Sequence, residues 1–327
     1  MEYVAQGFRA PFEFYNWMMS KSDPRTINWP LCGSPFPILS IIFSYVYFVK
    51  VLGPQWMKNR EPFKIEKIIV LYNVLMVIFS AGFFLYGGSY SYLPPWGKFS
   101  WFCEPVNYST DPEIIDMISI GWWFLLLKIV EFADTIFFVL RKKFTHISAL
   151  HVIHHSLVAW GIWIGMKFGA GGNNAFFPLI NCFVHTIMYS YYCLAALGPG
   201  MRKYLWWKKY LTILQMVQFV IAFAHSMIPL FYDCGYHKGF AYAIMFHAIL
   251  FMAMFMNFYR HTYNQQKKAA LQASATQNGT SVMKANGHSV NGTANKQNGT
   301  VQHQRKNGYN SVKAEECNGK SSDKKDL

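Results

Sequence analysis

WWFLLLKIVEFADTIFFVL, residues 122–140, has the length and apolarity of a membrane-spanning helix but carries four polar side chains. A helix needs about 20 mostly apolar residues to cross a bilayer. Ionisable residues inside such a helix are costly, and they usually face a cavity or a partner. The stretch therefore predicts a helical membrane protein with polar groups inside its bundle.

The composition of the whole chain agrees with this prediction. Of its 327 residues, 53% are hydrophobic and only 14% are charged, whereas about a quarter of the residues in soluble domains are charged. Six Cys in so long a chain exclude a small disulfide-stapled domain. The net charge of +14 does not indicate nucleic-acid binding, because the basic residues fall in short clusters between apolar runs.

Seven apolar runs predict an all-α polytopic membrane protein with seven transmembrane helices. The runs cover residues 36–53, 65–86, 114–140, 147–165, 175–197, 210–232 and 239–261. Eleven Lys and Arg lie in the connections on one side and three on the other, so the positive-inside rule places the first set in the cytosol. We expect a lumenal N-terminal segment (1–35), a seven-helix transmembrane catalytic domain (36–263) and a disordered cytosolic tail (264–327).

The polar side chains of the opening stretch share one side of the predicted helix. Lys128, Glu131 and Thr135 stand at i, i+3 and i+7, with Asp134 one position aside. Their charges can neutralise one another. The set could line a reaction chamber, or it could be a buried ion pair that only fixes packing.

The fourth span begins with three histidines on one helical face. His151, His154 and His155 stand at i, i+3 and i+4, close to the predicted cytosolic boundary. Three imidazoles on one face can ligate a metal, or they can supply a nucleophile and a base.

Two further spans carry polar stripes at helical spacing. Taken singly, each stripe is typical of interhelical hydrogen bonding. Four polar stripes in one bundle instead predict a lined chamber. The stripes consist of Asn181, His185, Tyr189 and Tyr192 in the fifth span, and of Thr212, Gln215 and Gln218 in the sixth.

Together these motifs resemble the signature boxes of the very-long-chain fatty acid elongases. The boxes are Lys128-x-x-Glu-x-x-Asp-Thr135, His151-x-x-His-His155, Asn181-x-x-x-His-x-x-Met-Tyr-x-Tyr-Tyr192 and Thr212-x-x-Gln-x-x-Gln218. The resemblance covers about residues 30–262. It implies a 3-oxoacyl-CoA synthase, which joins a long-chain or very-long-chain acyl-CoA to malonyl-CoA and releases CO2 and CoA. It also implies that helices 2 to 7 enclose a substrate tunnel, with the first span outside.

The resemblance assigns expected roles to the motif residues. His154 matches the nucleophile, which would form an acyl-histidine intermediate, while His151 and His155 would orient it or move protons. Oxyanion stabilisation and hydrogen-bond donation are expected from Asn181, His185, Lys128, Glu131 and Asp134. Substrate positioning is expected from Thr135, Tyr189, Tyr192, Gln215 and Gln218. No metal and no cofactor is implied.

The polyanionic CoA is expected at the cytosolic mouth of the bundle. Basic residues suit its phosphates, although anchoring to the membrane surface predicts the same residues. Besides both CoA substrates, we expect contact with membrane lipid, and the family allows a homodimer and association with other enzymes of the elongation cycle. The candidate phosphate-binding residues are Arg141, Lys142, Lys143, Lys203, Lys208 and Lys209.

Residues outside the spans predict the compartment. Lys324 and Lys325 match the C-terminal di-lysine retrieval signal of endoplasmic-reticulum membrane proteins. This predicts a multi-pass protein of that membrane, with a lumenal N-terminus and a cytosolic C-terminus. Cys103 and Cys234 lie in two lumenal loops, where they could form a disulfide or remain two unpaired thiols. Asn107 begins the sequon that we expect to be the glycosylation site.

Two other classes of protein share parts of this pattern. Membrane di-iron desaturases and hydroxylases also use a His-x-x-His-His box, but they need about eight histidines in several boxes to hold two metal ions. This chain has one complete box. A seven-helix receptor or carrier would explain the topology but neither the four polar stripes nor the retrieval signal.

Overall fold

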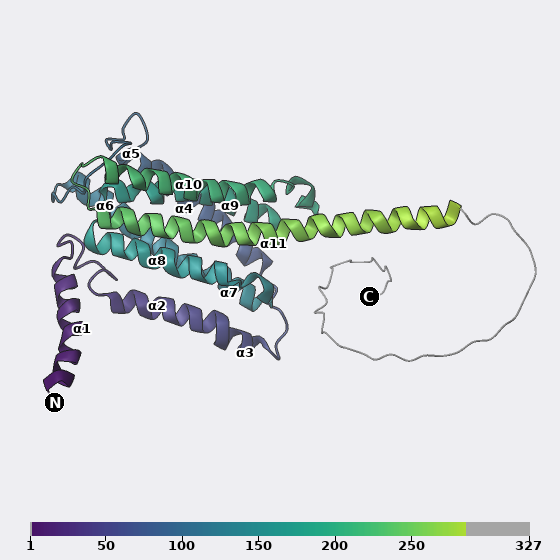
Figure 1. The fold of residues 1–327 in the computed structure, drawn as a ribbon, viewed down its shortest axis with the longest axis horizontal. Coiled ribbons are helices and arrows are strands. Elements are labelled where there is room, and N and C mark those ends of the chain that lie inside the picture. Colours follow the sequence, from purple (N-terminus) through teal and green to yellow (C-terminus); the bar gives the residue numbers. More distant parts are fainter. Residues whose placement is uncertain (1, 286–327) are drawn as a thin grey trace, which may run out of the picture. The chain divides into compact units, whose positions relative to one another are not determined.

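The computed structural model describes residues 2–285, which form helices with no β-strand among them (Figure 1). Those up to residue 270 belong to one compact unit. Two of the short elements, η1 and η2, are π-helical, and η3 to η5 are 3-10 helices. The elements are α1 (Glu2–Ser20), α2 (Pro35–Tyr47), η1 (Phe48–Leu52), α3 (Gly53–Met57), α4 (Glu66–Gly82), η2 (Phe83–Gly87), α5 (Gly88–Tyr90), α6 (Pro112–Val130), α7 (Phe132–Leu140), η3 (Phe144–His146), α8 (Ala149–Phe168), η4 (Gly172–Ala175), α9 (Phe176–Ala196), η5 (Pro199–Tyr204), α10 (Lys208–Phe231) and α11 (Lys238–Ala285).

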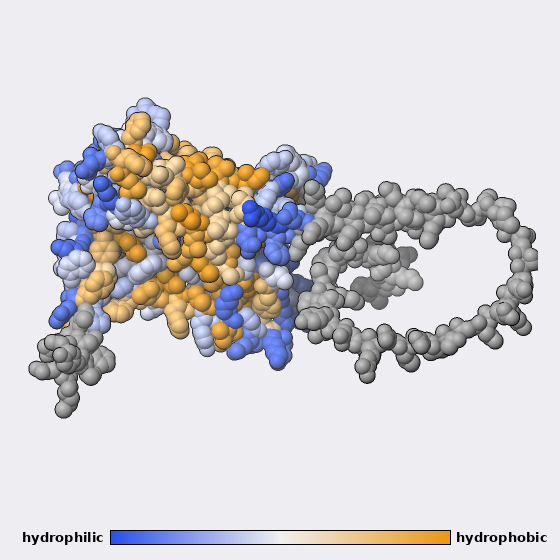
Figure 2. All heavy atoms as spheres, in the orientation of Figure 1, coloured by the Kyte–Doolittle hydropathy of each residue, from blue (hydrophilic) through white to orange (hydrophobic). Residues whose placement is uncertain are grey.

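Six helical stretches within residues 2–285 are long and apolar enough to cross a membrane, which makes the chain a multi-pass membrane protein. They confirm six of the seven predicted spans, with ends that differ by a few residues. The surface agrees, because Figure 2 shows an apolar band between two polar ends. The stretches are Pro35–Met57, Glu66–Tyr90, Ala149–Phe168, Gly172–Ala196, Lys208–Phe231 and Lys238–Asn264.

The remaining predicted span, residues 114–140, is divided into α6 and α7. The α-helix is interrupted at Glu131, which lies between the last residue of α6, Val130, and the first of α7, Phe132. The interruption coincides with a buried charge, since Glu131 and Lys128 are each only 2% exposed. The crossing of the membrane by α6 and α7 stays a prediction.

Pairs of helices that are distant in sequence build the bundle. α4 packs along α9, α6 packs along α8, and α10 contacts α9. Where α4, α6, α9 and α10 approach one another, Met76, Phe124, Tyr189 and Leu211 form one buried apolar cluster. α2 contacts α8. In a membrane such pairs are held by close packing and interhelical hydrogen bonds, because lipid is as apolar as the side chains.

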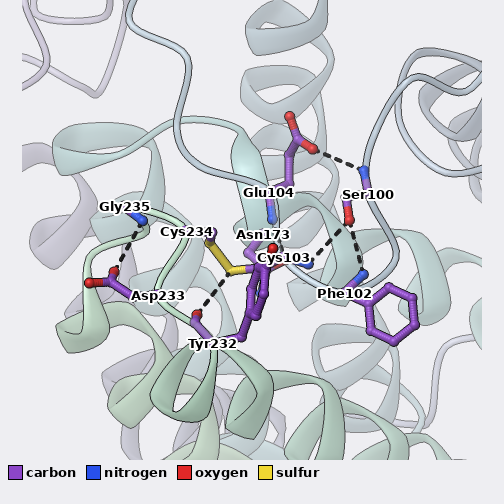
Figure 3. Close-up of a disulfide and its surroundings, with 9 residues drawn as sticks. All are labelled: Ser100, Phe102, Cys103, Glu104, Asn173, Tyr232, Asp233, Cys234 and Gly235. Atoms are coloured by element: carbon purple, nitrogen blue, oxygen red, sulfur yellow. Dashed lines mark hydrogen bonds between the residues drawn. A yellow bond between two sulfur atoms is a disulfide. The ribbon is translucent and has the colours of Figure 1, made fainter.

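The predicted disulfide between Cys103 and Cys234 is present in the structure (Figure 3). Their Cα atoms are 6.1 Å apart, within the usual range for a disulfide. The bond links the loop before α6 to the turn between α10 and α11. The alternative, that Cys103 and Cys234 remain two unpaired thiols, does not hold in the structure.

Hydrogen bonds tie the segment between α1 and α2 to the end of α8. The backbone N–H of Asp23 donates to the Lys167 carbonyl at 2.8 Å, and the Thr26 hydroxyl donates to the Met166 carbonyl at 2.8 Å. The Lys167 ammonium in turn donates to the Gly33 carbonyl at 3.1 Å. The last carbonyls of a helix have no partner within the helix. At the end of α8, the carbonyls of Met166 and Lys167 obtain their partners from this segment.

Arg25 joins the same segment to the loop that carries Asn107. Its guanidinium forms a buried ion pair with Asp23 at 2.6 Å and donates to the carbonyls of Asn107 and Ser109. The Asn107 side chain is exposed, and its amide oxygen accepts a hydrogen bond from the Ser109 N–H at 2.8 Å. Glycosylation of Asn107 stays a prediction.

The predicted tail boundary at residue 264 is not the end of a helix. α11 continues across this boundary to Ala285, and the disorder of the tail stays a prediction. The rest of the tail, including the retrieval-signal residues Lys324 and Lys325, lies outside the described residues.

Candidate functional site

Glu131 lies at the centre of a buried polar network. Its Oε1 accepts a hydrogen bond from the Lys128 ammonium at 2.7 Å and lies 3.1 Å from His185 Nδ1. Its other oxygen is 3.9 Å from His155 Nδ1. The break between α6 and α7 thus places one carboxylate against groups from α6, α8 and α9.

Lys128 extends the network to a second residue of α9. Its ammonium donates to the Asn181 amide oxygen at 2.6 Å and lies 3.5 Å from His185 Nδ1. A hydrogen bond from His185 to the Glu131 carboxylate requires a proton on Nδ1, which leaves Nε2 as the basic nitrogen of the neutral ring. The predicted neutralisation of Lys128 by Glu131 is confirmed, and Asn181 and His185 belong to the same network.

Asp134 and Thr135 do not join this network through a hydrogen bond. The Tyr189 hydroxyl donates to Asp134 Oδ2 at 2.7 Å. Thr135 is fully buried, and its hydroxyl shares a 2.8 Å hydrogen bond with that of Tyr45 on α2. The predicted polar stripe is therefore divided, because Thr135 faces the outer helix α2 and lines neither cavity described below.

The three histidines of the predicted box lie in the first turns of α8. Ser148 caps the helix, and its hydroxyl accepts a hydrogen bond from the His151 N–H at 3.2 Å. The His151 and His155 rings are 4.5 Å apart, and those of His154 and His155 are 5.7 Å apart. Within the described part of the chain, His151 Nε2 and His154 Nδ1 are buried without a hydrogen-bond partner.

A small polar cavity, of about 220 Å³ including the open space at its edge, lies beside His154. It brings together residues from three of the predicted motifs, on α8, α9 and α10. The amide of Gln215 is further held by a 3.3 Å contact with the Met188 sulfur. The cavity is lined by His154, Asn181, Val184, His185, Gln215, Gln218, Phe219 and Phe255.

A second and much larger cavity, of about 1380 Å³ including the open space at its edge, is almost entirely apolar. Residues of η2, α6, η4, α8, α9, α10 and α11 line it, and α2 contributes none of them. This arrangement agrees with the expectation that the first span lies outside. Neither Tyr189 nor Tyr192 lines either cavity, so the structure does not place these two predicted substrate-binding residues at them.

The charges of two basic residues from different predicted loops both act on His146. Partial burial of its ring, together with the charges of Lys143 and Lys208, lowers the pKa of His146 below its ordinary value. The other candidate phosphate ligands have neighbours of their own. Arg141 pairs with Glu66 at 3.3 Å, Lys142 donates to the Lys58 carbonyl, and Lys203 and Lys209 lie over the rings of Tyr204 and Tyr259.

Three aromatic residues beside His154 carry no motif and were missed by the sequence analysis. The ring centres of Phe251, Phe255 and Phe219 lie 4.6, 5.9 and 6.4 Å from that of His154. Phe251 and Phe255 are four residues apart on α11, and this spacing was the only signal of a shared face. Among residues 2–285, no three His, Cys, Asp or Glu side chains are grouped as metal ligands would be.

Comparison with known proteins gives one consistent family. The model of the GNS1/SUR4 family, abbreviated ELO, matches residues 30–271. A very long chain fatty acid elongase of Aedes aegypti is 47% identical over 254 residues, which are 78% of this chain and 70% of that protein. Very long chain fatty acid elongase 7 of Drosophila melanogaster is 47% identical over 267 residues, 80% of each chain. Elongase 4 of Mus musculus is 42% identical over 275 residues, 84% of this chain and 86% of that protein.

Proposed function

We propose, because this chain belongs to the GNS1/SUR4 family, that it catalyses the condensing step of fatty acid elongation. In this step a long-chain or very-long-chain acyl-CoA and malonyl-CoA give 3-oxoacyl-CoA, CO2 and CoA. Relatives at 42–47% identity are named very long chain fatty acid elongases. The single observation that supports the condensation most directly is the polar cavity where His154, His185 and Asn181 meet.

The first half-reaction is assigned to His154. Its buried Nδ1 has no partner among the described residues, so no hydrogen bond has to break before the imidazole can react. A ring nitrogen attacks the thioester carbonyl, a C–N bond forms, the C–S bond breaks, and CoA leaves with the proton that the imidazole gives up. His155, whose ring centre lies 5.7 Å from that of His154, orients the ring and takes up that proton, and His151, whose ring centre lies 4.5 Å from that of His155, carries it further.

The second half-reaction needs stabilisation of negative charge. Malonyl-CoA loses CO2, and the resulting enolate attacks the acyl carbonyl, so that a C–C bond forms and the C–N bond to His154 breaks. The released imidazole takes up one proton from water, which replaces the proton that left with CoA. Lys128 and Glu131 hold His185 and Asn181 in fixed positions on the cavity wall. Donors fixed in this way stabilise a developing oxyanion without reorganising during the reaction.

Gln215 and Gln218 complete the wall of the polar cavity, and we assign them to positioning the thioester and the malonyl carboxylate. The positive charges of Lys143 and Lys208 both lower the pKa of His146, and this shared positive field supports a site for the CoA phosphates at that end of the bundle. We place this end in the cytosol and the protein in the endoplasmic reticulum, as the loop charges and Lys324 with Lys325 predict.

The proposal is tested by incubating the purified protein with stearoyl-CoA alone, followed by intact-mass and peptide analysis. We expect an acyl adduct on His154 and one released CoA per adduct. His154→Ala should abolish the adduct and the condensation. His237→Ala is the matched control, because His237 is exposed in the turn before α11 and lines neither cavity.

Three results are distinguishable in this experiment. An adduct on His154 supports both the function and the covalent step. Formation of 3-oxoacyl-CoA without any adduct keeps the condensation and refutes the acyl-histidine. The absence of both adduct and product across chain lengths refutes the proposed condensation itself.

A further inference from the structure

The polar cavity and the apolar cavity are neighbours in the bundle. Phe219 of α10 is the residue that lines both. On α8, His154 belongs to the polar cavity and Val158, one turn further along, belongs to the apolar cavity. The boundary between the two spaces therefore lies about one helical turn from His154.

Two aromatic rings occupy this boundary. Phe219 and Phe251 are 3% and 1% exposed, and their ring centres are 5.7 Å apart. Phe251 also lines the apolar cavity while its ring centre lies 4.6 Å from that of His154. Both rings pack with Val158 and Ala248 in one buried cluster. They separate the reacting imidazole from the space that suits an acyl chain.

We propose that Phe219 and Phe251 form an aromatic partition that the acyl chain must pass, and that this partition selects the shape of the chain at one position. The inference rests on the proposed function, because it takes the acyl group to be attached at His154. A chain that starts there can reach the apolar cavity only if the two rings rotate apart. The opening they leave is then the narrowest part of the path.

The position on the chain follows from the helix geometry. Four residues of α8, from His154 to Val158, rise about 6 Å. An extended chain with C–C bonds of about 1.52 Å advances about 1.3 Å per carbon, so about the fifth carbon lies between the rings. Straight, unbranched chains pass most easily, and a methyl branch near this carbon widens the chain where the opening is narrowest.

The apolar cavity beyond the partition has free space along part of its α8 wall. Its wall includes glycines of α8, and a Cβ added at Gly165 would have no heavy atom within 4 Å. A methyl branch far from the thioester is therefore tolerated. Discrimination is expected to depend on where the branch is, because the partition is narrow and the wall at Gly165 is open.

The test measures condensation of three octadecanoyl-CoA substrates: the straight chain, a chain with a methyl group at about carbon 5, and one with the methyl group near its far end. For the natural protein we expect kcat/KM for the first branched chain to be roughly tenfold or more below that of the straight chain, a loss typical of poor fit in an apolar pocket. The far-branched chain should match the straight chain within about threefold.

Phe251→Ala and Phe219→Ala should each raise the ratio of near-branched to straight kcat/KM by several-fold. Phe223→Ala is the matched control, since Phe223 lies on α10 and packs against the same cluster but lines neither cavity. A general loss of active protein lowers both kcat/KM values equally and therefore cancels in their ratio. If Phe251→Ala does not fold, Phe251→Leu is used in its place, because leucine keeps an apolar side chain but removes the ring.

Failures of the two proposals are separable. If the natural protein makes no 3-oxoacyl-CoA from the straight chain, the proposed function fails and the partition fails with it. If it accepts both branched chains equally, only the partition is refuted. The partition is also refuted if the ratio is unchanged in folded Phe251 and Phe219 variants, or if Phe223→Ala changes it as much.

Discussion

Replacement of Lys128 by Met tests the buried network at its cation. Methionine keeps a long apolar side chain but removes the ammonium, which donates to Glu131 at 2.7 Å and to Asn181 at 2.6 Å. Glu131, only 2% exposed, would then retain its contact with His185 but no permanent positive partner. Removing one partner of a buried pair typically costs about 3–5 kcal/mol. At about 2–4 °C per kcal/mol, the midpoint of thermal unfolding should fall by about 6–20 °C.

The assay is thermal unfolding of the purified protein in detergent. After heating to each temperature, the folded fraction is measured as the height of the monodisperse peak in size-exclusion chromatography. Glu131→Gln is measured alongside, and so is the double variant, in which neither buried charge remains. We expect the double variant to be more stable than the sum of the two single losses, because each single variant leaves one charge uncompensated. A fall of less than about 2 °C for Lys128→Met, or strictly additive losses, would refute the compensation of Glu131 by Lys128.

Three further predictions concern other parts of the fold. Serine at Cys103 and Cys234 should lower stability by roughly 2–4 kcal/mol and abolish the mobility difference between reduced and oxidised protein on a gel. Thr135→Val should lower the free energy of unfolding by about 1–3 kcal/mol, because it leaves the buried Tyr45 hydroxyl without a hydrogen-bond partner. The KM for acyl-CoA should stay unchanged. A raised KM would instead indicate that Thr135 binds the substrate. Gly172→Ala should cost about 1–3 kcal/mol in a thermal unfolding assay, since φ is +57° and a Cβ would lie 2.8 Å from a backbone carbonyl oxygen; an unchanged midpoint would contradict this.

The sequence predicted the helices well because a membrane span leaves a simple signal, an apolar run of fixed length. Six of these runs are helices long enough to cross. Helical spacing also predicted that Lys128 and Glu131 would meet, since residues three apart share a face. The sequence placed Cys103 and Cys234 in loops on one predicted side of the membrane, where a disulfide was possible but two unpaired thiols remained the alternative.

The same periodicity was wrong about Thr135, because it assumes an uninterrupted helix. The helix is interrupted at Glu131. Beyond the interruption, Thr135 forms a hydrogen bond with Tyr45 instead of joining the polar network. The partition residues could not be predicted for a different reason. The chain has 29 Phe, and nothing local distinguishes Phe219 and Phe251 from those that only fill space between helices.

The ties between residues 23–33 and the end of α8 also set an order of events during synthesis. Thr26 and its partner Met166 are 140 residues apart, so at about 5–20 residues per second the ribosome delivers the partner roughly 7–30 s after the first residue. During this interval the segment has no helix end to bind. The ion pair between Asp23 and Arg25 needs no such delay, because its members are two residues apart. It can therefore fix the conformation of the segment before α8 has been synthesised and can bind to it.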